Sequence, residues 1–315
     1  MAAVNSEVTA GINTYVLYGK QTSFDTDVTP NTIFGGLVTN ASFETDRQYN
    51  ERAGFVGTND YDGRATSQQL AGTVVVNASV DFDVQRWDWL EHLMLKARTG
   101  NGTTETPYIY TIGNTPTFLT LTEEIDNVAT DSQRAYGGIV INSVNIKCSV
   151  GEPVSASVTL LGGRLSVGTT ITAKIAQLAD DVYNFSGGTI SVGGTPISNI
   201  IDSIALDYSN NYTLAYGFNE EAKNARPGKI NIGFKFTTKY FDDTLMTQFL
   251  GSATTVSAQT PVDIILKFTK GTNKYAEFTF KNVVINRQGT THSLNEFLVE
   301  DTDTLAQRLE VKEVI

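Results

Sequence analysis

The sequence predicts a mainly β protein of the α+β class, built from two tandem β-sandwich or barrel modules that each carry one flanking α-helix. Its 315 residues are too many for one average domain and suit two of roughly 150 residues. Only 18% of the residues are charged, while Thr, Ser, Asn and Gly are frequent, which favours strands and turns. A strand followed by a helix also occurs once in each half, which indicates an internal repeat.

The first strand signal lies in GTVVVNASVDFDV, residues 72–84. Apolar residues alternate with mostly polar ones from Val74 to Phe82, so one face of this strand is expected to meet a core. Directly afterwards Trp87, Leu90 and Met94 recur at helical spacing, with Gly100 following as a stop signal. The sequence therefore predicts a strand that runs into one amphipathic helix.

The second half repeats this strand and helix. Apolar residues alternate over residues 230–236, recur at helical spacing over 241–249, and are followed by Gly251. Residues 36–55 match 199–218 on one side of the unit, and 136–163 match 275–301 on the other, with Ile141 falling on Phe280. Three matched blocks in one order indicate a duplication, so we predict modules at 1–168 and 169–315. The second module is expected to begin with a hairpin between the glycine pairs of residues 187–194.

Composition excludes several function classes. The formal net charge is −11 and no cluster of Lys and Arg occurs, so tight binding to nucleic-acid phosphates is disfavoured. The N-terminal residues lack the pattern of a secretory signal, and no apolar run approaches the length of a membrane helix. The single cysteine, Cys148, cannot form an internal disulfide. We expect a protein that is made in the cytoplasm and does not enter a membrane.

No set of catalytic or metal-binding residues emerges from the sequence. His92 and His292 are too few for a multi-histidine metal site, and Cys148 alternates with apolar residues as a half-buried strand residue would. The segment from Thr58 to Gln69 superficially resembles a calcium loop but lacks its first ligand and its final glutamate. We therefore predict no enzymatic activity, no cofactor and no metal ion.

Several segments resemble the phage tail tube protein family, in its long, two-module form. They are YGK at residues 18–20, SFETDRQYNERAGF at 42–55, LAGTVVVNASVDF at 70–82 and VINSVNIKCSVGEPVSASVTLLGG at 140–163. The resemblance implies a structural virion protein that polymerises as stacked rings into the tube through which the DNA genome is ejected. A ring would contain three two-module chains as a pseudo-hexamer, or six chains. The implied partners are further copies of the chain, a tape-measure protein, the tail terminator, baseplate or distal tail proteins, and double-stranded DNA that passes without specific binding.

This resemblance turns two sets of residues into candidate surfaces. Alternation along the two matched strands leaves one set for an acidic lumen: Asn77, Ser79, Asp81, Asn231 and Lys235. Long polar stretches at 46–69 and 209–227 are candidate ring-to-ring contacts, with these residues: Arg47, Tyr49, Glu51, Arg52, Tyr212, Phe218, Glu221 and Arg226. Two alternatives stay open, namely another tail component such as a terminator, baseplate hub or sheath subunit, and a carbohydrate-binding β-sandwich protein.

Overall fold

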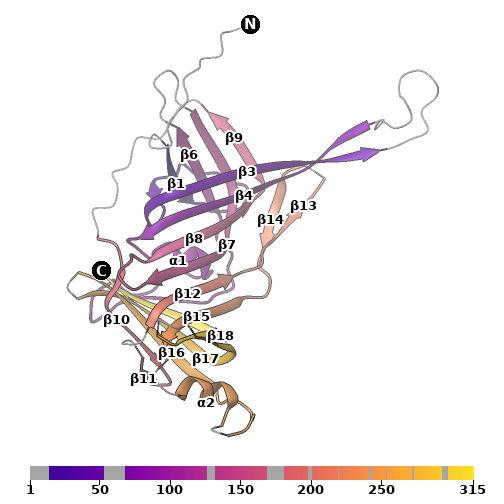
Figure 1. Ribbon diagram of the computed structural model, residues 1–315. Helices are drawn as coiled ribbons and strands as arrows, with labels where there is room; N and C mark the ends of the chain where they lie inside the picture. Colours follow the sequence, from indigo (N-terminus) through magenta and orange to yellow (C-terminus); the bar gives the residue numbers. More distant parts are fainter. Residues whose placement is uncertain are drawn as a thin grey trace.

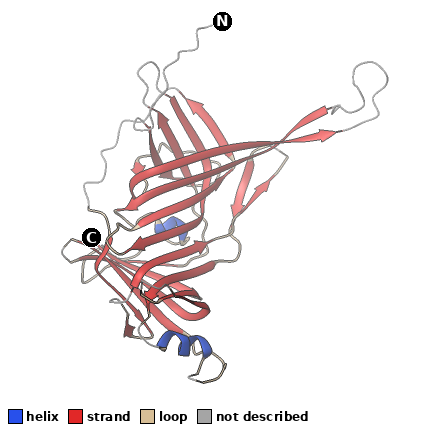
Figure 2. Ribbon diagram, in the orientation of Figure 1, coloured by secondary structure: helices blue, strands red, loops and turns tan. Residues whose placement is uncertain are grey.

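The structure is a computed structural model, and it describes residues 14–52, 68–125, 132–168, 181–197, 201–218, 220–240, 243–252, 254–271, 273–292 and 297–315. The described chain is mainly β, as the sequence predicts, and its strands pair antiparallel (Figure 1, Figure 2). No helix in these ranges is long and apolar enough to cross a membrane.

One long antiparallel ladder runs through both halves of the chain. Its order is β3 (Gly36–Arg52), β4 (Gln68–Val84), β8 (Ser155–Gly162), β7 (Ser132–Ser149), β12 (Ile201–Ser209), β15 (Asn231–Lys239), β18 (Val299–Leu305) and β17 (Lys274–Thr291). The β7–β12 pairing joins strands of the first half to strands of the second half. β3 and β17 lie at opposite ends, so the sheet of one chain is open rather than a closed barrel (Figure 1).

Two smaller sheets share strands with the long ladder. The first has the order β2 (Thr32–Ile33), β1 (Thr14–Lys20), β6 (Leu119–Ile125), β7 and β9 (Arg164–Gly168). The second has the order β11 (Thr195–Pro196), β10 (Asn184–Val192), β16 (Val262–Lys270), β17, β19 (Arg308–Val314) and β5 (Tyr108–Thr111). β7 and β17 each belong to two sheets, because they turn from one to the other near residues with positive φ, Gly138 at 63° and Asn282 at 52°.

The alternating strands bury their apolar faces as predicted. Val76, Val80 and Phe82 of β4 are buried, and so are Phe234 and Phe236 of β15. These side chains belong to one hydrophobic core that also includes residues of both smaller sheets. The alternation therefore fixes which face of the long ladder is apolar, since successive side chains of a strand point to opposite faces.

The predicted first helix is wrong in length. α1 is a single turn, Leu90–Leu93, with Leu95 at a φ of 58° shortly after it. Trp87 lies before this turn, fully buried against rings of the second half, Phe278 at 4.9 Å and Phe268 at 6.3 Å between centroids. Tertiary packing of the aromatic residues thus overrides the helical spacing, which reflected burial rather than a helix face.

The second helix and the predicted hairpin are partly as expected. α2 spans Thr244–Leu250 and ends at Gly251, whose φ of 75° is the left-handed conformation that glycine favours at a helix end. Gly193 and Gly194 form the turn between β10 and β11, also with positive φ. The pair at 187–188 lies inside β10 rather than in a turn, where the β10–β16 register shifts.

Candidate assembly surfaces

His92 and Cys148 are buried in the described chain, whereas His292 is exposed. Burial lowers the pKa of His92 to about 4, and burial raises the pKa of the Cys148 thiol to about 11. Neither side chain is therefore poised to titrate near neutral pH. No group of three or more potential metal ligands occurs among the residues that the structure describes.

The predicted lumen residues share one face of the long ladder. Asn77 and Asn231 are exposed, Ser79 and Asp81 are half-buried, and Lys235 is exposed, all in the strand positions between buried apolar ones. The ladder thus brings residues of both halves onto one continuous polar face. Whether this face lines a lumen stays a prediction.

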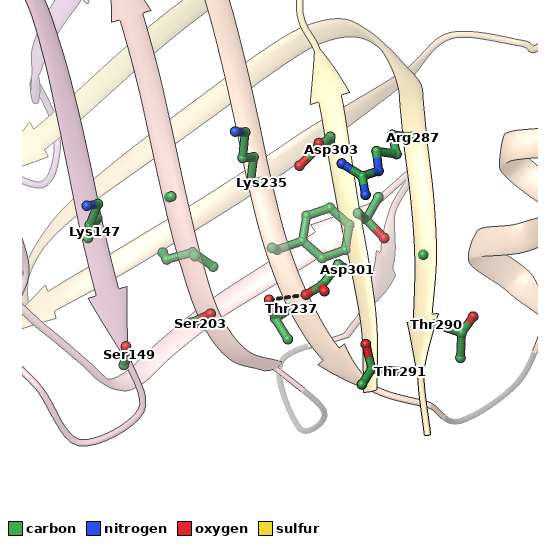
Figure 3. A pocket seen from close by; sticks show the side chains of 15 residues that line it. Lys147, Ser149, Ser203, Lys235, Thr237, Arg287, Thr290, Thr291, Asp301 and Asp303 are labelled. Carbon is green, nitrogen blue, oxygen red and sulfur yellow. Dashed lines mark hydrogen bonds between the residues drawn. The ribbon is translucent and has the colours of Figure 1, made fainter. Parts of the chain in front are cut away.

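Charges on this face are mixed rather than uniformly acidic. Asp303 of β18 lies between Lys235 of β15 and Arg287 of β17 as a cross-strand neighbour of both. These three residues line an open depression together with Lys147 of β7 and Asp301 of β18 (Figure 3). There the Thr237 hydroxyl donates a hydrogen bond to Asp301 at 2.7 Å. This part of the face is therefore not uniformly acidic, because the net charge of −11 is a sum over the chain and does not fix where charges lie.

The first polar stretch forms an arm. β3 and β4 remain paired far beyond the rest of the sheet, and their paired ends project away from it in Figure 1. Arg47 lies on this arm and forms an ion pair with Glu220. Tyr49, Glu51 and Arg52 belong to β3 and pair with β4 through their backbone, but their side chains lie outside the described part.

The second polar stretch forms a small hairpin against the base of that arm. β13 (Thr213–Tyr216) pairs with β14 (Ala222–Arg226). The Tyr216 hydroxyl donates to the carbonyl oxygen of Val74 at 3.0 Å, and the amide of Val74 donates to the carbonyl oxygen of Glu220 at 2.8 Å. The two polar stretches, distant in sequence, are thus joined within one chain.

The four candidate contact residues of this second stretch fall into two groups. Phe218 lies between β13 and β14 and is fully exposed, and Glu221 and Arg226 are exposed as well. Tyr212, by contrast, is buried within the chain, and its amide donates to the side chain of Asn142 at 2.8 Å. Tyr212 is therefore a core residue rather than a contact residue. Its place among polar neighbours in the sequence gave no sign of this burial.

Sequence reasoning missed the polar centre that joins the two halves. The Tyr110 hydroxyl of β5 donates to Glu313 of β19 at 2.6 Å, and the Trp87 amide donates to the same carboxylate at 3.3 Å. Burial is the main cause that raises the pKa of Glu313 above its usual value. Nearby, the ammonium of Lys270 donates to the carbonyl oxygen of Gln85 at 2.8 Å. A glutamate in the alternating segment RLEVKEV gives no signal that it is buried.

A family model described as phage tail tube protein matches residues 11–310, nearly the whole chain. No significant match was found among curated proteins. The mainly β architecture agrees with the family match. The chain therefore belongs to the phage tail tube protein family and is a structural protein of the virion tail.

Proposed function

We propose that copies of this chain form stacked rings, and that the rings form the tail tube through which the double-stranded DNA genome is ejected. The observation that carries the proposal is the open ladder. Among the described strands, its end strand β3 pairs only with β4, and residues 284–291 of its other end strand, β17, pair only with β18. An unpaired strand edge is a template for another strand. Head-to-tail contacts between copies close into a ring when the rotation between them closes.

The size of such a ring suits its purpose. Each of three copies would contribute one eight-strand ladder of the kind given above. In the proposed arrangement each ladder consists of two four-strand modules, with the module boundary near residue 168. With strands about 4.8 Å apart and tilted by roughly 40°, the circumference is about 150 Å and the backbone diameter about 48 Å. That bore is wide enough for double-stranded DNA after side chains are subtracted.

The polar face of the ladder suits a passing rather than a bound nucleic acid. It carries both signs of charge, as in the row Lys235, Asp303 and Arg287. Tight binding to DNA requires clustered cations that replace the counterions of many phosphates. A mixed face on a chain with net charge −11 offers little of this attraction, so DNA would move through without sticking.

The arm and the hairpin are the proposed ring-to-ring contacts. The arm carries Arg47, Tyr49, Glu51 and Arg52, and the hairpin region adds exposed residues: Phe218, Glu221 and Arg226. Deleting Arg47 to Gln69 should leave the far-UV circular dichroism of a folded β protein and single rings in electron micrographs, but no tubes. Tubes of normal length from this variant would remove the assignment.

The remaining partners follow from the place of a tube in a tail. A tape-measure protein, a tail terminator and baseplate or distal tail proteins would meet the tube, and assembly would take place in the host cytoplasm. Purified full-length chain, concentrated and imaged by negative-stain electron microscopy, tests the central proposal. Stacked rings or tubes are expected, whereas monomers that persist at high concentration would refute it.

A further inference from the structure

The two halves of the chain meet through a strand pairing with a defined register. β7 and β12 pair from Ser143 opposite Ser209 to Ser149 opposite Ser203. Just before this ladder the Asn210 side chain donates to the carbonyl oxygen of Ile141 at 3.2 Å. The β7–β12 pairing within one chain therefore provides a template for the pairing between the second half of one copy and the first half of another.

β3 and β12 have the same irregularity in the same place. The β3–β4 register shifts between Val38 and Asn40, and the β12–β15 register shifts between Ile201 and Ser203, 163 residues later. A β-bulge is a specific local feature that re-aims a strand. β3 therefore stands in the first half where β12 stands in the second.

β7 and β17 correspond in the same way. The β7–β8 register shifts between Ile141 and Ser143, and the β17–β18 register shifts between Ile285 and Arg287, 144 residues later. The sequence match of Ile141 with Phe280 is thus five residues out of register. Gln259 bonds to both the amide and the carbonyl oxygen of Ile285, where Asn210 bonds to Ile141.

The two free edges therefore have a deduced register. Adding 144 to each β7 residue number gives the corresponding residue of β17, and subtracting 163 from each β12 residue number gives the corresponding residue of β3. Applied to the β7–β12 pairs, this places Arg287 opposite Asp46, Gly289 opposite Glu44, and Thr291 opposite Ser42. Arg287 and Asp46 are opposite charges, which stabilise a cross-strand pair. Ser42, Glu44 and Asp46 are exposed in the single chain and so is Thr291.

β9, at an edge of a sheet in the first half, exposes apolar side chains that a second copy of the chain could cover. β9 has the sequence RLSVG and β19 has RLEVK, again 144 residues later. Leu309 and Val311 of β19 are 3% and 0% exposed, and β5 of the first half pairs with the outer edge of that strand. The corresponding Leu165 and Val167 of β9 are 36% and 70% exposed.

We propose that the junction between the halves is repeated between copies, with β17 of one copy pairing antiparallel with β3 of the next. The register has Arg287 opposite Asp46 and Thr291 opposite Ser42. Residues 254–261 of the first copy, which lie between α2 and β16, then cover Leu165 and Val167 of the next copy, as β5, which lies between α1 and β6, covers the outer edge of β19 within the chain. The proposal rests on ring assembly and specifies which strands meet, and in which register.

Disulfide trapping in the full-length chain tests the register. The double variant Ser42→Cys with Thr291→Cys is assembled, oxidised and run on a denaturing gel without reductant. Directly opposite strand residues have Cα atoms about 4.5–5.5 Å apart, within reach of a disulfide. We expect a ladder of covalent dimers and higher oligomers. The matched control is Glu44→Cys with Thr291→Cys, since diagonal partners lie about 7–8 Å apart, and it should stay uncrosslinked.

The outcomes separate this inference from the proposed function. Tubes that crosslink in the control pair but not in the test pair would overturn the register, and tubes that crosslink in neither would overturn the β17–β3 pairing while leaving the tube function intact. A wild-type chain that forms no rings or tubes would remove both. Independently, Val167→Asp should raise the concentration needed for assembly at least tenfold, whereas Val167→Ile should not. Unchanged assembly of Val167→Asp would refute the contact at β9.

Discussion

Replacing Trp87 by alanine tests how firmly the two halves are joined. The indole is fully buried, with ring centroids of Tyr183, Phe268 and Phe278 within 6.3 Å, all from the second half of the chain. A buried Trp→Ala change removes apolar contacts and leaves a cavity, which together cost about 3–5 kcal/mol. We therefore expect Trp87→Ala to lose about 4 kcal/mol of unfolding free energy, a large part of the 5–15 kcal/mol that is usual for a domain.

Urea unfolding followed by far-UV circular dichroism measures this loss, at a protein concentration too low for assembly. Phe218→Ala is the matched control, because its aromatic ring is fully exposed, and it should change the unfolding free energy by less than about 0.5 kcal/mol. Trp87→Phe should lie between the two. A loss below about 1 kcal/mol for Trp87→Ala would show that this ring cluster does not hold the halves together.

Three further predictions concern buried titratable groups. Burial lowers the pKa of His92 from 6.5 to about 4, so the unfolded chain takes up a proton at a higher pH than the folded chain does. The unfolding free energy of the wild type should therefore fall by up to about 3 kcal/mol relative to that of His92→Gln between pH 6.5 and 4. Equal pH profiles of the two proteins would contradict this prediction. The pH dependence expected for Glu313 has the opposite sign. Burial raises the pKa of Glu313, so its contribution to the unfolding free energy weakens as pH rises above the ordinary pKa of 4.5. Glu313→Gln should therefore become more stable relative to the wild type over that range in the same urea assay. The Cys148 thiol is buried with a pKa raised to about 11, so it should react with a thiol reagent at pH 8 at least tenfold faster in urea than in the folded protein; equal rates would show an accessible thiol.

Much of the strand architecture could be predicted from local pattern. Alternation identified β4 and β15 and their buried faces, because the two-residue period of a strand is written directly into the sequence. Gly251 was identified as a helix end because the left-handed conformation favours glycine. The helical spacing of Trp87, Leu90 and Met94 predicted a longer helix than the single turn of α1, since apolar residues that are buried from several directions can mimic a helix face.

The candidate surfaces were less accessible to local reasoning. The polar stretch around Tyr212 looks solvated in sequence, yet the chain folds back so that this ring is buried. Arg47 and Glu220 are 173 residues apart and meet only because the hairpin lies against the arm. Such contacts depend on how separate elements dock, and no short-range pattern encodes docking.

The sequence by itself determined the mainly β class, the polar and apolar faces of the long ladder, and a family resemblance that the family match later confirmed. These follow from composition, from the period of two along a strand and from matched segments. Only the tertiary structure decided that β7 pairs with β12, that Glu313 is buried where the two halves meet, and that β3 and residues 284–291 of β17 are the open edges of the long ladder. Pairings between distant strands depend on long-range packing and on the register set by bulges, which local sequence does not specify.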